Sequence, residues 1–355
     1  MVQISNFQLM VMVFSTMLAN GLNVLPRLAA GLAGPGGWII VLLQGLGSIL
    51  AVIALVKVCR QFPDASFVNL NKRVFGGVIG TLVGLIIGID FIFEAGNVAR
   101  GVVNIAITSV YSQTPIVVLM ALVMAVAVYA VYQGIEVLAR TNTVLFVLKL
   151  MAIIILTLLT IPALASDNLL PLWDRGSLPW AEGLVNIQSA YSGFIILAFL
   201  YPYLNSHRGT GKMASLALLL VTIAYVEMTV VTIALFNSCE VSREIWPTIS
   251  FIRAAPFPMD APFMLVWVTN AFSVIAGCLY IASEALKEVL KLKDYRSILL
   301  PSAVIAMTIG VWPRNLVEVG ELSTNIAYVG VFIHIVLPFV LLAVITITKK
   351  QQPKP

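Results

Sequence analysis

Charged residues are scarce in this sequence, and their scarcity excludes most classes of soluble protein. Asp, Glu, Lys and Arg make up 10% of the 355 residues, whereas a soluble domain carries about 25%. Hydrophobic residues make up 60%, and the mean hydropathy is +1.01. Apolar runs of about 20 residues, each long enough to cross a bilayer as a helix, recur from end to end. The composition predicts an integral membrane protein with no soluble domain left over.

Motifs for enzyme chemistry are also missing. The sequence has no phosphate-binding glycine loop, no His and Cys spacing of a metal site, and no nucleophile signature. The three cysteines, Cys59, Cys239 and Cys278, are scattered without disulfide or metal spacing. We therefore expect no catalytic activity, no metal and no cofactor. The net charge of +5 mostly reflects an excess of Lys and Arg in the segments on one side of the membrane. It does not indicate nucleic acid binding.

Ten apolar segments predict ten transmembrane helices in one all-α domain over 1–355. A segment rich in Pro, Gly and Asp, 163–181, divides five spans from five as an extracytoplasmic connection. Because each half has an odd number of spans, the halves 1–162 and 182–347 have opposite orientations in the membrane. This is the arrangement of a five-plus-five inverted repeat. The ten spans are placed near 6–31, 37–58, 76–109, 115–132, 141–162, 182–204, 213–237, 261–283, 297–312 and 323–347.

Lys and Arg are distributed unevenly between the two sets of connecting segments. One set holds four of them, Arg175, Arg243, Arg253 and Arg314. Cytoplasmic connections carry the excess in most membrane proteins, so we expect both termini in the cytoplasm, on the side of the larger set. That set holds fourteen of the 21, namely Lys57, Arg60, Lys72, Arg73, Arg140, Arg208, Lys212, Lys287, Lys291, Lys293, Arg296, Lys349, Lys350 and Lys354.

The first span of each half contains a polar interruption. Span one has two amides, a glycine and a proline between Ala19 and Pro26, and span six has a similar stretch from Asn186 to Gly193. An unwound turn exposes backbone groups that must bind something in hydrocarbon, and half-helix N-termini favour a carboxylate. Small polar residues also occur where helices simply pack closely. The matched positions favour a ligand site, with helices one and six discontinuous near Gly21–Asn23 and Ser189–Gly193.

Ionisable residues inside apolar spans are costly and are functional candidates by default. On span three, Asp90, Glu94 and Asn97 fall on one polar stripe that must face the bundle interior or water. Lys149 lies in the middle of span five, either as a fixed ion pair with Asp90, Glu94 or Glu227, or as a site that exchanges a proton. The full set is Asp90, Glu94, Arg100, Lys149, Glu227 and His334. We expect His334 to be a hydrogen-bonded packing residue.

One further stretch, Tyr132-Gln133-Gly134-Ile135-Glu136-Val137-Leu138-Ala139-Arg140-Thr141, follows span four. We expect Glu136 and Arg140 to pair at the cytoplasmic end of that span. Together with the two interruptions and the ten-span length, this stretch resembles the spore-germination permease family, the B-type subunits of nutrient germinant receptors. That family is a branch of the amino acid–polyamine–organocation transporter superfamily. The sequence differs from the superfamily's Gly-Ser-Gly style of first-helix motif in having Asn20-Gly21-Leu22-Asn23.

The resemblance implies a ten-helix inverted repeat in the inner membrane of the endospore, a small amino acid as ligand, and A-type and C-type partner subunits. A proton-coupled secondary amino acid transporter is the alternative, because fold does not separate the two, and a channel role draws only on the polar stripe of span three. We expect the ligand near the bilayer midplane, between spans one, three, six and eight. The candidate binding residues are Asn20, Gly21, Leu22, Asn23, Glu94, Asn97, Val98, Gln188, Ser189, Tyr191, Ser192, Phe194 and Asn270.

Overall fold

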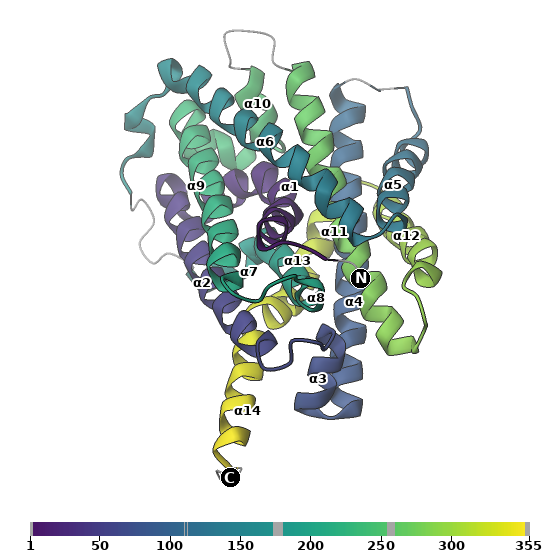
Figure 1. Cartoon of the computed structure of the whole chain (residues 1–355). Coiled ribbons are helices and arrows are strands. Elements are labelled where there is room, and N and C mark those ends of the chain that lie inside the picture. The colour runs from purple at the N-terminus through teal and green to yellow at the C-terminus, as the bar shows by residue number, and fades with distance from the viewer. Residues whose placement is uncertain (1–2, 110, 112, 173–179, 254–259, 352–355) are drawn as a thin grey trace.

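The computed structural model describes residues 3–109, 111, 113–172, 180–253 and 260–351, and nearly all of them are helical (Figure 1). The predicted spans correspond to α1 (Asn6–Ala33), α2 (Gly37–Cys59), α4 (Gly77–Ser109), α5 (Ile116–Tyr132), α6 (Ile135–Thr160), α7 (Trp180–Ile187) with η4 (Gln188–Ile195) and α8 (Ile196–Leu200), α9 (Thr210–Arg243), α11 (Asp260–Leu290), α12 (Arg296–Val311), and α13 (Leu316–Val331) with η6 (Phe332–Val336) and α14 (Leu337–Gln351). Short elements connect them: η1 (Gly34–Gly36), α3 (Phe67–Phe75), η2 (Ile161–Ala163), η3 (Ser166–Leu169), η5 (Tyr201–Tyr203) and α10 (Pro247–Arg253).

The described helices are apolar enough to place the chain in a membrane. Seven stretches of 18 residues or more have the length and composition of a membrane span, and three shorter apolar helices accompany them. One of the seven, Gly21–Cys59, joins the second half of α1 to α2. The stretches and short helices together cover all ten predicted spans. The predicted class, an integral membrane protein of about ten helices, is confirmed.

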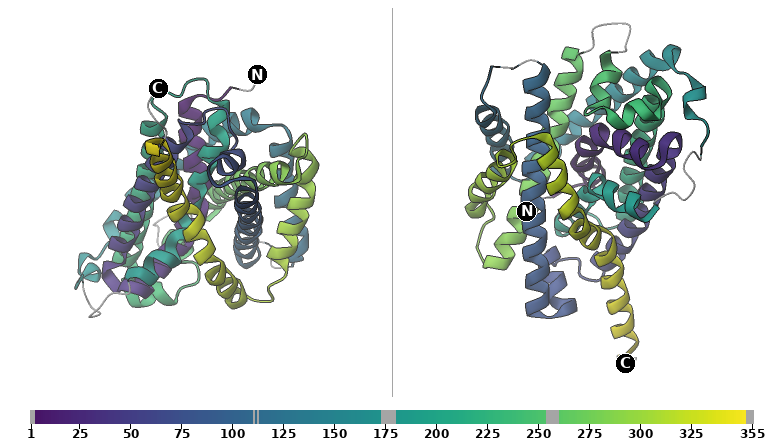
Figure 2. Two further views of the ribbon diagram at one scale, coloured as in Figure 1. Left: turned by 90° about the horizontal axis from the view of Figure 1, so that it is seen from below. Right: turned by 180° about the vertical axis from the view of Figure 1, so that it is seen from behind.

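Helix packing follows the five-plus-five repeat. Helix α4 packs on α12, so that span three lies against span nine. The repeat relates span three to span eight and span nine to span four, and α11 of span eight does pack on α5 of span four. In the same way, α1 of span one packs on α9 of span seven, and the equivalent pair, span six with span two, is formed by α7 and η4 packing on α2. Two views in Figure 2 show the long helices α4 and α11 beside the bundle that surrounds α1. The division of the chain at 163–181 stays a prediction, since residues 173–179 lie outside the described residues.

Span one is not interrupted, and this corrects the prediction. Helix α1 runs from Asn6 to Ala33 with Pro26 inside it. Proline has no N–H, so the carbonyl of Leu22 loses its helical partner. The hydroxyl of Thr248, on the short helix α10, donates to that carbonyl at 2.7 Å. A side chain from a connecting segment therefore satisfies the polar group that Pro26 leaves unpaired, and the helix continues.

Replacing Thr248 by valine should lower the free energy of unfolding by about 1–3 kcal/mol, because a buried carbonyl is left without a donor. Thr248 is buried, with 1% of its surface exposed. Thermal unfolding in detergent measures the effect. Thr308→Val is the matched control, because the Thr308 hydroxyl is exposed and donates only within its own helix, to Val304. Equal melting of the two variants would show that the Thr248 bond contributes nothing.

Span six is interrupted as predicted, and span ten is interrupted without having been predicted so. Between α7 and α8 the chain winds as a 3₁₀ helix through η4. Span ten contains the π-helical turn η6. Span five begins earlier than expected, at Ile135, so that Glu136 and Arg140 form their predicted pair in the first turns of α6 rather than at the end of span four. The helices α3 and α10 were not predicted.

Candidate functional site

The space beside Gly21 is occupied by an aromatic side chain. Gly21 faces the ring of Tyr225 on α9 so closely that a Cβ atom there would overlap the ring. The Tyr225 hydroxyl lies 2.5 Å from the carbonyl oxygen of Met17 and 3.1 Å from that of Ala190, and so can donate to either. Tyr225 thus connects spans one, six and seven where a ligand cradle was expected. Its only sequence signal is a hydroxyl-bearing aromatic residue within an aliphatic span.

Spans one, six and eight meet without a gap one turn earlier. A Cβ atom on Gly193 of η4 would fall 2.6 Å from the backbone oxygen of Thr16, and one on Gly277 of α11 would fall 2.7 Å from the Thr16 side chain. Gly193 and Gly277 therefore permit close packing of the three spans. At these two positions, the small residues serve helix packing.

Lys149 has a hydroxyl partner, and not the carboxylate of the fixed ion pair that was one of its two predicted roles. It is fully buried, and its Nζ donates to Ser273 Oγ on α11 at 2.8 Å. Among the described residues no Asp or Glu forms an ion pair with it. Asp90 pairs with His334, and Glu227 accepts a hydrogen bond from Thr157. The predicted fixed ion pair is therefore wrong, and proton exchange at Lys149 stays a prediction.

Lys149→Met should leave the free energy of unfolding unchanged or raise it, because methionine fills a similar volume and no carboxylate loses a partner. Ser273 keeps its own bond to the Thr269 carbonyl at 2.9 Å. Lys149→Ala is the control, since its cavity should cost about 2–4 kcal/mol. Thermal unfolding in detergent distinguishes the variants. A loss of about 3–5 kcal/mol in Lys149→Met would instead indicate a broken buried ion pair.

A pocket lies between span three, the 3₁₀ segment of span six, and span ten. Two carboxylates, an imidazole, an amide and two hydroxyls give it a polar lining, and one aromatic ring, Phe93, forms an apolar wall. Helix α4 supplies the acids because they are four residues apart and so face the same side. The lining residues are Asp90, Phe93, Glu94, Asn97, Ser189, Ser192, Ile326, Ala327, Gly330 and His334.

The structure brings together part of the predicted site and adds span ten to it. Of the candidate residues, Asp90, Glu94, Asn97, Ser189 and Ser192 line the pocket. The side chain of Asn20 lies outside the described residues. Span ten was not assigned to the site, although a histidine in an apolar span followed by a proline was a usable signal. The candidates that do not line the pocket are Gly21, Leu22, Asn23, Val98, Lys149, Gln188, Tyr191, Phe194, Glu227 and Asn270.

His334 is buried and packed as expected, with a polar partner, and it also lines the pocket. Its Nε2 lies 3.2 Å from Oδ2 of Asp90, with the imidazole 1% and the carboxylate 10% exposed. The rings of Phe91 and Phe194 contact the imidazole edge-on, with centroids 5.6 and 6.4 Å away. The residue belongs to the π-helical turn η6, and such turns are frequent at functional sites. Asp90 therefore pairs with His334 of span ten, and both residues line the pocket.

Buried amides that do not line the pocket have distinct roles. Gln188 Oε1 accepts a hydrogen bond from Nε2 of Gln44 on α2, and the Tyr191 hydroxyl donates to the Val41 carbonyl at 3.1 Å. These bonds hold η4 on span two. Asn23 is 2% exposed, and neither of its amide atoms has a hydrogen-bond partner among the described residues. An unsatisfied buried amide is unusual, so Asn23 stays a candidate for binding a small polar molecule.

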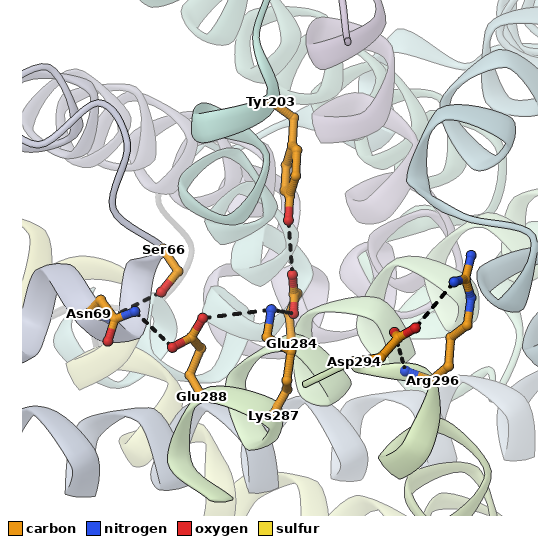
Figure 3. Close-up of polar contacts among 8 residues, drawn as sticks. All are labelled: Ser66, Asn69, Tyr203, Glu284, Lys287, Glu288, Asp294 and Arg296. Atoms are coloured by element: carbon orange, nitrogen blue, oxygen red, sulfur yellow. Dashed lines mark hydrogen bonds and ion pairs between the residues drawn. The ribbon is translucent and has the colours of Figure 1, made fainter. Parts of the chain in front are cut away.

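A second polar cluster lies at one end of span eight, outside the pocket (Figure 3). Tyr203 donates to Glu284 at 3.2 Å, and Lys287 bridges Glu284 at 2.7 Å and Glu288 at 3.6 Å. Asn69 of α3 donates to Glu288 at 2.8 Å. The cluster therefore ties α3 and the segment after span six to α11. Just beyond it, a hydrogen bond from the Arg296 backbone holds the pKa of the Asp294 carboxyl below its usual value.

The chain resembles known germination proteins along nearly its whole length. Residues 3–319 match the family model described as "Spore germination protein". Spore germination protein B2 of Bacillus subtilis (strain 168) is 27% identical, over 94% of this chain and 92% of the relative. Spore germination protein KB of the same organism is 26% identical, over 96% and 92%. Spore germination protein GerQB of Bacillus cereus is 23% identical, over 95% and 94%.

Solved structures share the fold of this chain. MhsT in complex with L-phenylalanine superposes with a TM-score of 0.72 at 14% identity, over 96% of this chain and 88% of that one. The nucleobase-cation-symport-1 transporter Mhp1 follows with 0.68 at 15%, over 96% and 77%. These likenesses support the inverted-repeat fold that the sequence predicts. The family model covers most of the sequence, so the chain belongs to the spore germination protein family.

Proposed function

We propose that this protein is a membrane subunit of a nutrient germinant receptor that binds a small amino acid and triggers spore germination. The observation that carries the proposal is the polar pocket between α4, η4 and α13–η6, which is built where the helices of spans six and ten depart from α-helical winding. Such departures free backbone groups near a cavity. The germination proteins that match this chain support the biological role.

The proposed signal is a population shift between two arrangements of the interrupted helices against the remaining spans. A ligand shifts that equilibrium only if it binds one arrangement more tightly. The resemblance implies A-type and C-type subunits as receivers of the signal, in the inner spore membrane, with both termini of this chain in the cytoplasm. Because the pocket combines carboxylates with amide and hydroxyl groups, a zwitterionic ligand suits it better than an apolar one.

Equilibrium binding of the twenty L-amino acids to the protein in lipid nanodiscs tests the proposal. Binding of at least one of them, followed by germination of spores in response to the same compound and loss of that response when the gene is deleted, is the expected result. A protein that binds no amino acid, or spores that respond normally without it, would contradict the proposal.

A proton-coupled amino acid transporter is the second candidate. The likeness to transporters and the buried amine of Lys149 favour it. Accumulation of labelled amino acids in proteoliposomes, with and without a proton gradient, distinguishes the two functions. Binding without gradient-dependent accumulation is expected of a receptor, and accumulation that collapses with the gradient is expected of the transporter.

A further inference from the structure

The charge of the pocket is unbalanced toward the acidic side. Asp90 and Glu94, 10% and 8% exposed, lie one helical turn apart on α4, and His334 is the single lining residue able to carry positive charge. Two carboxylates at membrane depth are costly unless cations or donors face them. A ligand that enters this pocket therefore meets an acidic wall on span three, which favours an ammonium group over a carboxylate at that end.

The partner of Asp90 is held by contacts that a ligand can replace. The imidazole of His334 makes one polar contact, to Asp90, and its Nδ1 is buried without a hydrogen-bond partner among the described residues. Its remaining contacts are edge-on packing against Phe91 and Phe194. An ammonium group carries a full charge and three donors, so it is a stronger partner for a carboxylate than an imidazole with one donor in reach.

The segment that carries His334 is wound differently from the helices on either side of it. Residues Phe332–Val336 form a π-helical turn, whereas α13 before it and α14 after it are α-helical. Single π turns inside α-helices are rare and occur frequently at functional sites. Helix α14 packs on α2 and α3 and continues past the body of the protein to the C-terminal end (Figures 1 and 2). Release of His334 therefore acts on the helix that projects farthest from the bundle.

We propose, on the basis of the function proposed above, that the ligand binds through its ammonium group at Asp90 and displaces His334, and that this exchange moves the π-helical turn and α14. The ligand class is then a primary amine, and an amino acid whose amine is blocked does not bind. Span ten becomes the output element of the pocket, because it carries both the displaced side chain and the projecting helix.

Three ligand mixtures test the amine requirement in nanodiscs: the twenty L-amino acids, their N-acetyl derivatives and their amides. The amides keep the ammonium group and should bind within about tenfold of the free amino acids. The N-acetyl mixture should bind at least about 100-fold more weakly, a difference of about 2.7 kcal/mol. Failure of all three mixtures would contradict the proposed function itself. Equal binding of free and N-acetylated amino acids would overturn the ammonium assignment alone.

Histidine NMR tests the displacement, because the chain has two histidines. With ring-labelled histidine, and His207→Gln to assign the signals, the amino acid mixture should move the His334 resonance and leave that of His207 in place. An unmoved His334 resonance in a protein that binds ligand would overturn the exchange. His334→Gln should bind ligand about threefold or more tightly, because a competitor for Asp90 is weakened; unchanged or weaker binding would contradict the proposal.

Asp90→Asn supplies the complementary test. It should weaken binding about tenfold or more, whereas Glu136→Gln, which changes an acid of the exposed pair on α6, should not. Spin labels on the exposed native Cys239 and on Ile347→Cys of α14 should report a ligand-induced change of distance that Asp90→Asn abolishes. If Asp90→Asn does not fold, the same distance is measured in His334→Gln, where a shift toward the ligand-bound value without ligand is expected and the unliganded wild-type distance would contradict the proposal.

Discussion

Gly21→Leu is expected to prevent the protein from reaching its folded state. The side chain would be built into the ring of Tyr225, which lies directly against Gly21. The ring cannot move aside without losing the contacts of its hydroxyl with the Met17 and Ala190 carbonyls. Overpacking of one or two methylene groups costs about 1–3 kcal/mol, and leucine adds more volume than that at a buried three-span junction. Yield and melting temperature in detergent measure the loss.

Two controls separate this cause from an effect on ligand binding. Gly47→Leu on α2 should fold normally, because a Cβ atom there meets nothing within 4 Å. Gly21→Leu combined with Tyr225→Ala should recover part of the lost stability, because removing the ring makes room for the new side chain. A Gly21→Leu protein that folds like the wild type would show that Tyr225 does not occupy this space.

Ser192→Phe is expected to lower ligand affinity by about 100-fold or more while leaving the protein folded. Ser192 is 7% exposed and lines the pocket from η4, so a phenyl ring at this position occupies the volume in which the ligand is proposed to bind. A hundredfold loss corresponds to about 2.7 kcal/mol. Thr308→Phe makes the same change of size on an exposed face of α12 and should bind normally. Equal affinities in the two variants would remove the pocket from the binding site.

The arrangement of spans could be predicted because it follows from composition and length. Each apolar run corresponds to helical structure, and the interruption in span six, Gln188–Ile195, overlaps the predicted stretch from Asn186 to Gly193. The polar stripe on span three was equally predictable, since Asp90, Glu94 and Asn97 share a face by helical geometry alone, and all three line the pocket.

The predictions that were wrong concern contacts between residues far apart in the sequence, which spacing along the chain does not reveal. Span one contains the same kind of polar stretch as span six, yet it remains helical because Tyr225 and Thr248 from distant segments pack against it or satisfy its carbonyls. Lys149 is paired by Ser273 rather than by an acid, because the acids of span three face span ten. Which face of one helix meets which face of another depends on tertiary packing, and a single sequence does not specify it.

Span ten is the clearest case. The sequence marks His334 as an ionisable residue in an apolar run, but only the π-helical turn and the packing of η6 bring it beside Asp90. A π turn has no reliable signature in a single sequence, because it depends on one extra residue being accommodated by its neighbours. The pocket therefore became a three-span site only once the packing of α13 and η6 on α4 and η4 was known.

The location of a bound amino acid tests the central claim most directly. The protein in lipid nanodiscs, incubated with the twenty L-amino acids, should show ligand density between α4, η4 and α13, in contact with Asp90 and Ser192, with Tyr225 still packed against Gly21. Density beside Gly21 and Asn23 with Tyr225 displaced, and none in the pocket, would contradict the claim and restore the interrupted first span as the binding site.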